Sequence, residues 1–171
     1  MSEALRDIGN RVMMLFGRGV VRAVSDNGPR QQVQIELLKG ELRDDLEHMQ
    51  EYGFTSHALG GDAAVAFLGG NREQGIVLVV DDRRYRIALN PGEVAVYDDL
   101  GNRIELLREM VKVTAVQHLE VVAPTIKLIG DLEVVGNTTT TGTFTNNGVD
   151  ISSTHKHGGV QPGSANSGAP I

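Results

Sequence analysis

The 171-residue sequence has no cysteine and no tryptophan, and only 4 phenylalanines and 3 tyrosines. Without cysteine the chain forms no disulfide and no thiolate metal site, so any metal must be held by histidine or carboxylate ligands. It also lacks a run of about 18 apolar residues, which a membrane-spanning helix needs. The first seven residues lack the basic and apolar regions of a signal peptide. We therefore expect a soluble chain that is made in the cytoplasm.

The composition favours a small domain joined to an elongated element. There are 21 glycines, and the few aromatic residues supply too little mass for one large globular core. The formal charge of −6 argues against nucleic acid as a partner, because a nucleic-acid-binding surface needs basic groups to replace the counterions of phosphates. The expected partners are proteins.

The first residues predict a short amphipathic helix within residues 1–17. Ser2 is a candidate N-cap and Gly17 a candidate stop. Apolar residues between these two positions recur at helical spacing, namely Leu5, Ile8, Val12, Leu15 and Phe16.

A series of short strands follows, with turn residues between them. Strands are expected at residues 20–24, 33–37, 65–68 and 76–80, and turns at residues 26–29 and 69–71. Residues 41–52 fit both a helix and a strand, and we favour a strand for their second half, up to Gly53. Four or five short strands predict a Greek-key barrel over residues 18–88, of which the OB-fold is the common type at this size. Two more strands are expected at residues 94–97 and 103–107, around a tight turn.

A six-residue pattern then repeats over residues 110–148. Its units are residues 110–115, 118–123, 125–130, 131–136, 137–142 and 143–148. In the first four units the second and fourth residues are apolar, the third is charged and the sixth is Ala or Gly. This is the period of a strand followed by a turn, not that of a helix.

The repeat predicts that three chains wrap around a common axis. A single-chain solenoid needs about three coils to bury a core, and six units give only two coils. No helix or second sheet follows residue 110 to cover the apolar positions. A three-sided prism would enclose Val111, Val113, Leu119, Val121, Ile126, Leu128, Leu132 and Val134, and would expose Lys112, Glu120, Lys127 and Glu133. Towards residue 148 the pattern becomes more polar, so additional ions on the axis are an option.

A histidine pair, His155 and His157, follows the repeat. In an extended segment the two side chains point to the same side, and three chains on a three-fold axis would bring six imidazoles together in an octahedral cage. That geometry favours iron or nickel over zinc. Taken alone, the pair is more typical of two solvated loop histidines, and its position at the end of a trimeric repeat is what favours the metal cage. His48, His57 and His118 have no such spacing and are interpreted as ordinary polar or core residues.

The run of residues 40–57, the turn of residues 69–72 and the C-terminal residues 153–163 resemble the baseplate assembly protein V family, and in particular its Mu-type members. These proteins are the central tail spikes of contractile-tailed phages. The resemblance implies an OB-fold that docks on the tail hub, a trimeric intertwined β-helix shaft at residues 89–150, and a pointed apex with a tail at residues 151–171. It further implies one iron ion per trimer, held by His155 and His157 of three chains, and a tip that perforates the host outer membrane.

The expected function is therefore mechanical rather than enzymatic, in the tail baseplate of the virion. An alternative is a trimeric acyltransferase of the hexapeptide-repeat class, with a histidine base between subunits. An OB-fold that binds nucleic acid is a third option, although its candidate stacking residues are as easily core: Tyr52, Phe54, Phe67 and Tyr85. The carboxylates Glu41, Asp44, Asp45 and Glu47 could suggest a glycosidase pair, but we favour a solvated acidic loop or a contact with a basic hub surface.

Overall fold

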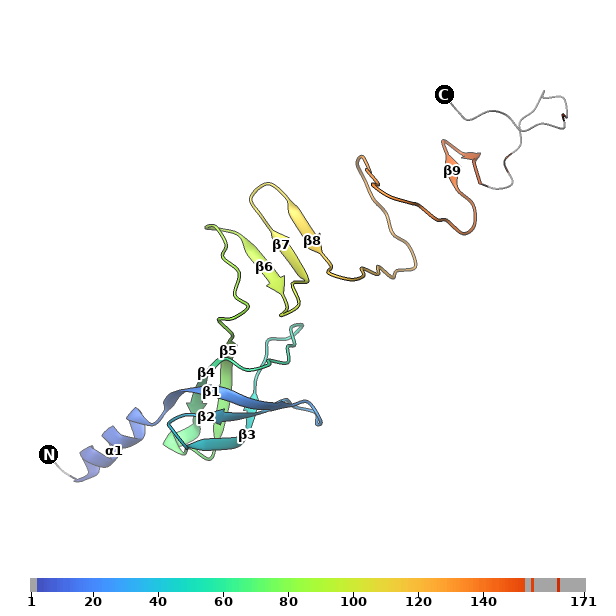
Figure 1. Cartoon of the computed structure of the whole chain (residues 1–171). Coiled ribbons are helices and arrows are strands. Elements are labelled where there is room, and N and C mark those ends of the chain that lie inside the picture. The colour runs from blue at the N-terminus through green and yellow to red at the C-terminus, as the bar shows by residue number, and fades with distance from the viewer. Residues whose placement is uncertain (1–2, 153–154, 156–162, 164–171) are drawn as a thin grey trace. The chain divides into compact units, whose positions relative to one another are not determined.

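The structure is a computed structural model that describes residues 3–152, residue 155 and residue 163 (Figure 1). The chain falls into two compact units, Met1–Leu119 and Glu120–Ile171, and each is described by itself. Within the described residues, no helix is both long enough and apolar enough to cross a membrane.

The first unit begins with helix α1, Glu3–Met13, which confirms the predicted helix. The helix ends earlier than expected, because Gly17 is not its stop but lies in strand β1, Phe16–Ser25. A Cβ atom on Gly17 would lie 3.1 Å from the Phe67 ring and 3.2 Å from the Leu37 side chain. Gly17 therefore provides space for core packing rather than a helix cap.

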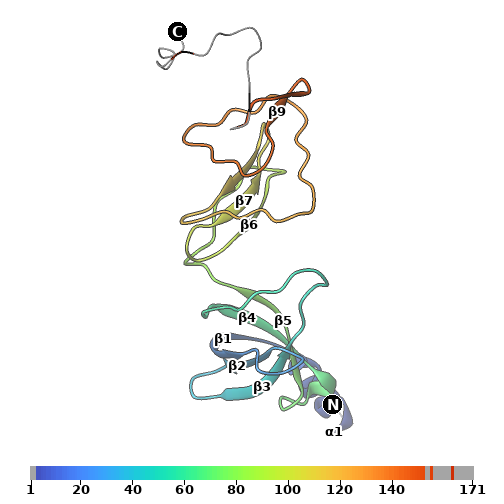
Figure 2. The same cartoon turned by 90° about the vertical axis from the view of Figure 1, so that its right-hand side faces the viewer.

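Five strands form a closed barrel in the order β1-β2-β3-β5-β4 (Figure 2). After β1 come β2 (Gln32–Glu36), β3 (Leu42–His48), β4 (Asp62–Phe67) and β5 (Gly75–Asp81). The short 3-10 helix η1 (Leu68–Gly70) lies between β4 and β5. Strands β3 and β5 are parallel, and the other neighbouring pairs are antiparallel. The prediction of a small five-stranded barrel is confirmed at this level.

Strand β3 differs from the expectation for residues 41–52. The strand occupies the first part of that segment and stops at His48, well before Gly53. Its pairing with β2 shifts between Val33 and Ile35, where an extra residue bulges out of β3 and Asp45 adopts a φ of 55°. A bulge interrupts the two-residue alternation of a strand, which explains the ambiguous sequence pattern.

The barrel core is small and aliphatic, with one aromatic ring. The inward-facing residues of β1 to β5 alternate with exposed ones, and Ile35, Val65 and Val77 are completely buried. The buried hydrophobic cluster consists of Val21, Val33, Ile35, Leu46, Ala63, Val65, Phe67 and Val77.

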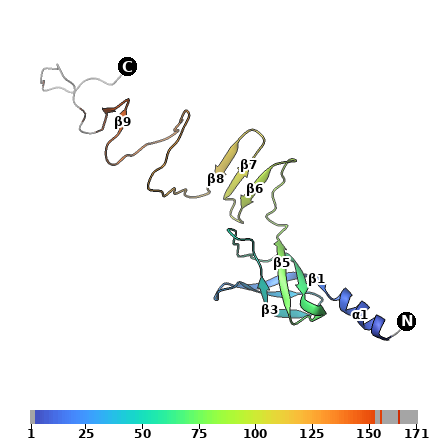
Figure 3. The same ribbon diagram turned by 180° about the vertical axis from the view of Figure 1, so that it is seen from behind.

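A three-stranded antiparallel sheet follows in the order β6-β7-β8 (Figure 3). It consists of β6 (Val94–Tyr97), β7 (Arg103–Leu106) and β8 (Val111–Thr114). The two strands predicted around the tight turn are confirmed, and the first hexad supplies the third strand.

The second unit carries the hexad period in its backbone. Gly130, Gly136, Gly142 and Gly148 stand at the sixth position of four consecutive units, and each has a positive φ, which residues with a side chain rarely adopt. Residues 115–144 contain no strand in the single chain. The last hexad and the two residues after it form a hairpin. Its strands are β9 (Thr145–Asn146) and β10 (Val149–Asp150), and Asn147 and Gly148 join them. Both turn residues have a positive φ, as a type I′ hairpin turn requires.

Candidate functional site

One face of the β6-β7-β8 sheet is apolar throughout. The strand register places Val96 opposite Ile104 and Ile104 opposite Val113. In the second row on this face, Val94 lies opposite Leu106, and Leu106 lies opposite Val111. All six side chains are between 46% and 68% exposed in the single chain. A sheet face of this kind normally packs against a core, so it is a candidate assembly surface.

The other face of the same sheet is polar. Arg103 Nε lies 2.9 Å from Glu105 Oε2, and the side chain of Glu105 is only 12% exposed. Ala95, Tyr97, Lys112 and Thr114 occupy the remaining positions on this face, and Tyr97 is 39% exposed. The polar face is thus the better covered of the two, which is the reverse of what an isolated sheet in water favours.

The hexads also expose apolar side chains in the single chain. The eight residues expected inside a prism, listed above, are all at least half exposed in the single chain. The fifth residue of three hexads is exposed even more: Val122 at 83%, Ile129 at 87% and Val135 at 91%. Sequence analysis did not single out these fifth positions. The sequence does show two adjacent apolar residues at the fourth and fifth positions of these hexads. Successive side chains of a strand point to opposite faces, so one residue of each pair must lie on the face opposite the prism interior.

The β9-β10 hairpin leads to His155, one of the two predicted metal ligands. Asp150, the last residue of β10, accepts a hydrogen bond through its carbonyl oxygen from His155 Nδ1, at 2.6 Å. A carbonyl oxygen only accepts, so Nδ1 carries the proton and Nε2 carries the lone pair of the neutral ring. The backbone N–H of His155 also donates to Ser152 O, at 3.0 Å. The second predicted ligand, His157, lies outside the described residues, as do Gly158 and Gly159.

The described part of the chain brings together no group of three or more His, Asp or Glu side chains that could hold a metal ion. A cage built by one chain alone is therefore absent from the described residues. Histidine ligands commonly donate their second ring N–H to a backbone carbonyl, as His155 does, so this residue fits a ligand that binds through Nε2.

The acidic cluster of the barrel is engaged with neighbours in the same chain. Arg72 Nη1 donates to both carboxylate oxygens of Glu41, at 2.6 and 2.7 Å. Glu47 accepts from Arg30 at 2.7 Å. These ion pairs support a structural role for the cluster and not a pair of catalytic acids.

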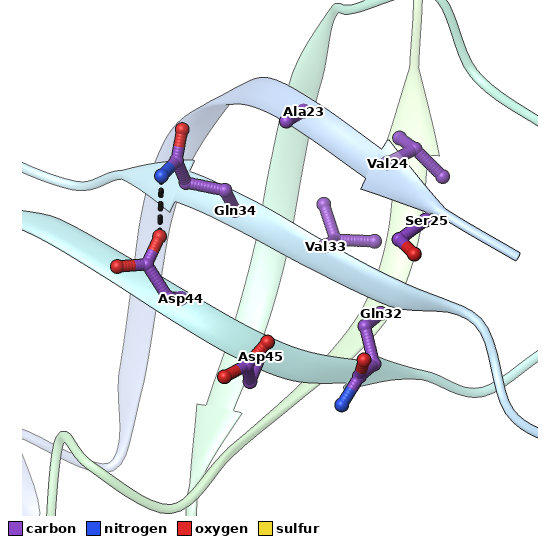
Figure 4. A pocket seen from close by; sticks show the side chains of 8 residues that line it. All are labelled: Ala23, Val24, Ser25, Gln32, Val33, Gln34, Asp44 and Asp45. Carbon is purple, nitrogen blue, oxygen red and sulfur yellow. Dashed lines mark hydrogen bonds between the residues drawn. The ribbon is translucent and has the colours of Figure 1, made fainter. Parts of the chain in front are cut away.

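A shallow pocket lies over β1, β2 and β3, beside the bulge (Figure 4). Gln34 Nε2 donates to Asp44 Oδ1 across the two strands, and Asp45 lies apart from this pair. Small and polar side chains line the pocket, together with Val24 and Val33. The arrangement does not place two carboxylates on opposite sides of a cleft, as a glycosidase requires.

A polar network under residues 49–61 involves two histidines that the sequence analysis treated as ordinary. Gln31, which is 8% exposed, donates from Nε2 to Asp26 Oδ1 and to the carbonyl of Ser56, both at 2.9 Å. Its Oε1 lies 2.6 Å from His48 Nδ1. His57 Nδ1 in turn lies 2.7 Å from Asp26 Oδ2. Period-based sequence analysis does not detect this network, because its contacts join residues far apart in the chain.

Two ionisable groups of this network have shifted pKa values. Burial lowers the pKa of His48, because the charged imidazolium loses its hydration. Hydrogen bonds from His57 and Gln31 lower the pKa of Asp26, because they stabilise its carboxylate. The network thus holds residues 49–61 in place with His48 favoured in its neutral form.

The aromatic residues considered for base stacking divide into two groups. Phe67 is a core residue, and Tyr85 is partly buried. Tyr52 and Phe54 are instead exposed on the segment that the polar network holds. The core alternative therefore holds for Phe67 and does not hold for Tyr52 and Phe54.

The comparisons with known proteins agree on one class. The family model "Bacteriophage Mu Gp45, N-terminal" matches residues 18–84, and the model "GpV Apex motif" matches residues 153–170. The "Baseplate puncturing device gp45" of Escherichia phage Mu is 35% identical over 144 residues, which cover 78% of this chain and 73% of the relative. The "Mu-like prophage FluMu protein gp45" of Haemophilus influenzae is 36% identical over 96 residues, which cover 56% and 53%.

The described chain thus combines a closed β-barrel with a repetitive segment whose apolar positions are exposed. The chain belongs to the baseplate assembly protein V family. As a member of this family it is a component of the virion, in the tail baseplate.

Proposed function

We propose that the protein is the central spike of a contractile tail, that it acts as a homotrimer, and that its tip pierces the host outer membrane. The observation that carries this proposal is the apolar face of the β6-β7-β8 sheet. Six apolar side chains on one face are at least 46% exposed, whereas the polar Glu105 on the other face is nearly covered. Burying the apolar face between chains removes it from water and supplies the main driving force for assembly.

The hexad backbone supports three chains as the number that closes the shaft. Its glycines turn the chain after every six residues, but the single chain pairs no strands over residues 115–144. Backbone amide and carbonyl groups of an extended segment need partners, and neighbouring copies can provide them along the whole segment. Three copies around one axis also leave no open strand edge. The predicted β-helix shaft of residues 89–150 is part of this proposal.

The proposed metal site lies at the apex of the chain. His155 fits a ligand that binds through Nε2, since its Nδ1 donates to Asp150 O. We propose that His155 and His157 of three chains hold one iron ion, which would cross-link the three chain ends and resist splaying under load. The apex motif, which spans residues 153–170, is the comparison that supports this part.

The barrel is proposed to be the part that docks on the tail hub, as an OB-fold. Its strand number and Greek-key type agree with that fold. Residues 49–61 present Tyr52 and Phe54 to solvent on a backbone fixed by the Gln31 network, so they offer a preformed apolar contact for another protein. Nucleic acid is not the expected partner, because the chain is acidic.

The acyltransferase alternative has no support from the family models or from the relatives, one of which is named a baseplate puncturing device. Assaying the purified chain for turnover of coenzyme A thioesters separates the two functions. Turnover that exceeds the blank and is lost in a His118→Ala variant would favour the enzyme.

The test of the assembly surface compares two substitutions on opposite faces of the same sheet. Ile104→Asp places a charge on the apolar face, and Lys112→Asp places one on the polar face. Light scattering of each full-length variant gives its mass in solution. We expect a trimer for the parent and for Lys112→Asp, and a monomer or a loss of soluble protein for Ile104→Asp. A trimer of unchanged stability with Ile104→Asp would contradict the proposed surface.

A further inference from the structure

Helix α1 carries an apolar stripe without a cover in the single chain. Leu5, Ile8 and Val12 lie on one face of the helix, and each is 58% or 59% exposed. Among the described elements, α1 packs mainly against the short helix η1. The stripe therefore remains in water over the described length of α1.

A helix of this length needs tertiary packing. It has 11 residues, and isolated helices shorter than about 12 to 15 residues are marginal in water. The Asp7–Arg11 ion pair, at 3.3 Å and one turn apart, is well exposed and contributes only a few tenths of a kcal/mol, about 0.3 to 0.5. An apolar contact along the stripe is the larger available source of stability.

The spacing of the stripe identifies the type of partner. Intervals of three and then four residues separate Leu5, Ile8 and Val12, which is the spacing of a helical seam with Leu5 and Val12 at the a positions and Ile8 at d. Leu5 at a with Ile8 at d is a combination that favours three or four helices over two, and the next a position is the β-branched Val12. The flanking residues Ala4 and Gly9 are small, and a Cβ atom on Gly9 would meet nothing within 4 Å. Other helices can therefore approach this seam closely.

The charged residues leave the seam free of charge repulsion. Glu3, Arg6 and Asp7 stand away from the seam in this register, and Arg11, which borders it, is already paired with Asp7 on its own helix. Assembly of several copies through the stripe thus requires no charged group to lose its solvent or its partner.

We propose that the three α1 helices of one spike pack against one another as a short parallel bundle through Leu5, Ile8 and Val12. The proposal rests on the trimer described above, which tethers three copies of the helix and so raises their effective concentration to the millimolar range, about 1 mM or more. This tether compensates for the short seam, which has too few heptads to associate stably by itself. The bundle would give the spike a second point of trimer contact, separate from the sheet face.

The absence of cysteine allows a direct test on the full-length chain. Single variants Ile8→Cys, on the seam, and Asn10→Cys, on the opposite side of the same helix, are treated with a short bismaleimide, and products are separated under denaturing conditions. We expect cross-linked dimers and trimers for Ile8→Cys, at least fivefold more than for Asn10→Cys. Native mass spectrometry of each variant before treatment reports whether the trimer itself is present.

The outcomes separate this inference from the proposed function. A trimer in which both variants cross-link equally, or in which neither does, would overturn the bundle and leave the spike intact. In that case the stripe serves another protein of the baseplate. A monomeric parent chain would overturn the bundle and the proposed trimer together. A further variant, Ile8→Asp, should abolish protection of α1 from proteolysis while the trimer persists, and unchanged protection would also contradict the bundle.

Discussion

Arg72 holds Glu41 by two hydrogen bonds from one nitrogen, at 2.6 and 2.7 Å, and so joins the turn after η1 to the start of β3. The guanidinium also lies 5.8 Å from the centre of the Phe67 ring, over the barrel core. Both ionic side chains are less than a third exposed, so solvent screens the pair only partly. The contact therefore fixes the turn after η1 against the start of β3.

Replacing Arg72 by Ala should destabilise the barrel by about 2 kcal/mol, because hydrogen bonds to charged groups contribute about 1.5 to 3 kcal/mol each. Urea unfolding followed by circular dichroism, at fixed protein concentration, measures the loss. Arg83→Ala is the matched control, since Arg83 also pairs with a carboxylate, Asp62, but is 71% exposed. Equal losses for the two variants would show that the Glu41 contact has no special role.

Gly19 should tolerate no side chain. A Cβ atom there would lie 2.4 Å from the Ile35 side chain and 2.6 Å from the backbone oxygen of Glu36, and the backbone of β2 cannot move without breaking its pairing. Gly19→Ala should cost about 1 to 3 kcal/mol of unfolding free energy. Gly28→Ala, whose new atom would meet nothing closer than 3.8 Å, should be neutral in the same thermal unfolding assay. A neutral Gly19→Ala variant would disprove this strand packing.

The barrel should lose stability when the solution is acidified through the range below the ordinary histidine pKa, about 6.5. The pKa of His48 is lowered in the folded state, so the unfolded chain binds more protons in this range and the folded state is disfavoured as the pH falls. Urea unfolding at pH 8 and pH 5 measures the difference. His48→Gln should reduce the difference, whereas His118→Gln should leave it unchanged. An undiminished difference in His48→Gln would assign the effect to other groups.

Removing the two apical histidines should remove the metal without disrupting the trimer. Elemental analysis of purified His155→Ala/His157→Ala protein should show less than a tenth of the iron bound by the parent, while light scattering still reports a trimer. The double variant His57→Ala/His118→Ala is the control and should bind iron as the parent does. Retention of iron by the apical variant would exclude these residues as the ligands.

The sequence predicted those parts of the fold that depend on local periodicity. The helix, the barrel strands with clear two-residue alternation and the six-residue turns all follow from the spacing of apolar residues and glycines, for example Gly130 and Gly136. The bulge at Asp45 broke that alternation and concealed most of β3. Gly17 looked like a helix stop because its actual reason, space for the Phe67 ring, comes from a residue far away in the sequence.

The candidate site was predictable in part. The sequence predicted strands at residues 94–97 and 103–107 and an inward position for Val113, but not the apolar face on which the structure places Val113 in one row with Val96 and Ile104. The fifth hexad positions and the Gln31 network were not predicted, because both depend on three-dimensional neighbours. Of the predicted ligand pair, His155 has a hydrogen bond that orients its ring, and its partner His157 lies outside the described residues.

Native mass spectrometry of the full-length chain, purified without added metal, tests the central claim most directly because it reports subunit number and bound ion in one spectrum. The account predicts a trimer of the 18.4 kDa chain with one additional mass of an iron ion. A trimer without metal would contradict the proposed apex and retain the spike. A monomer, with its apolar sheet face and hexads left in water, would contradict the proposed function itself.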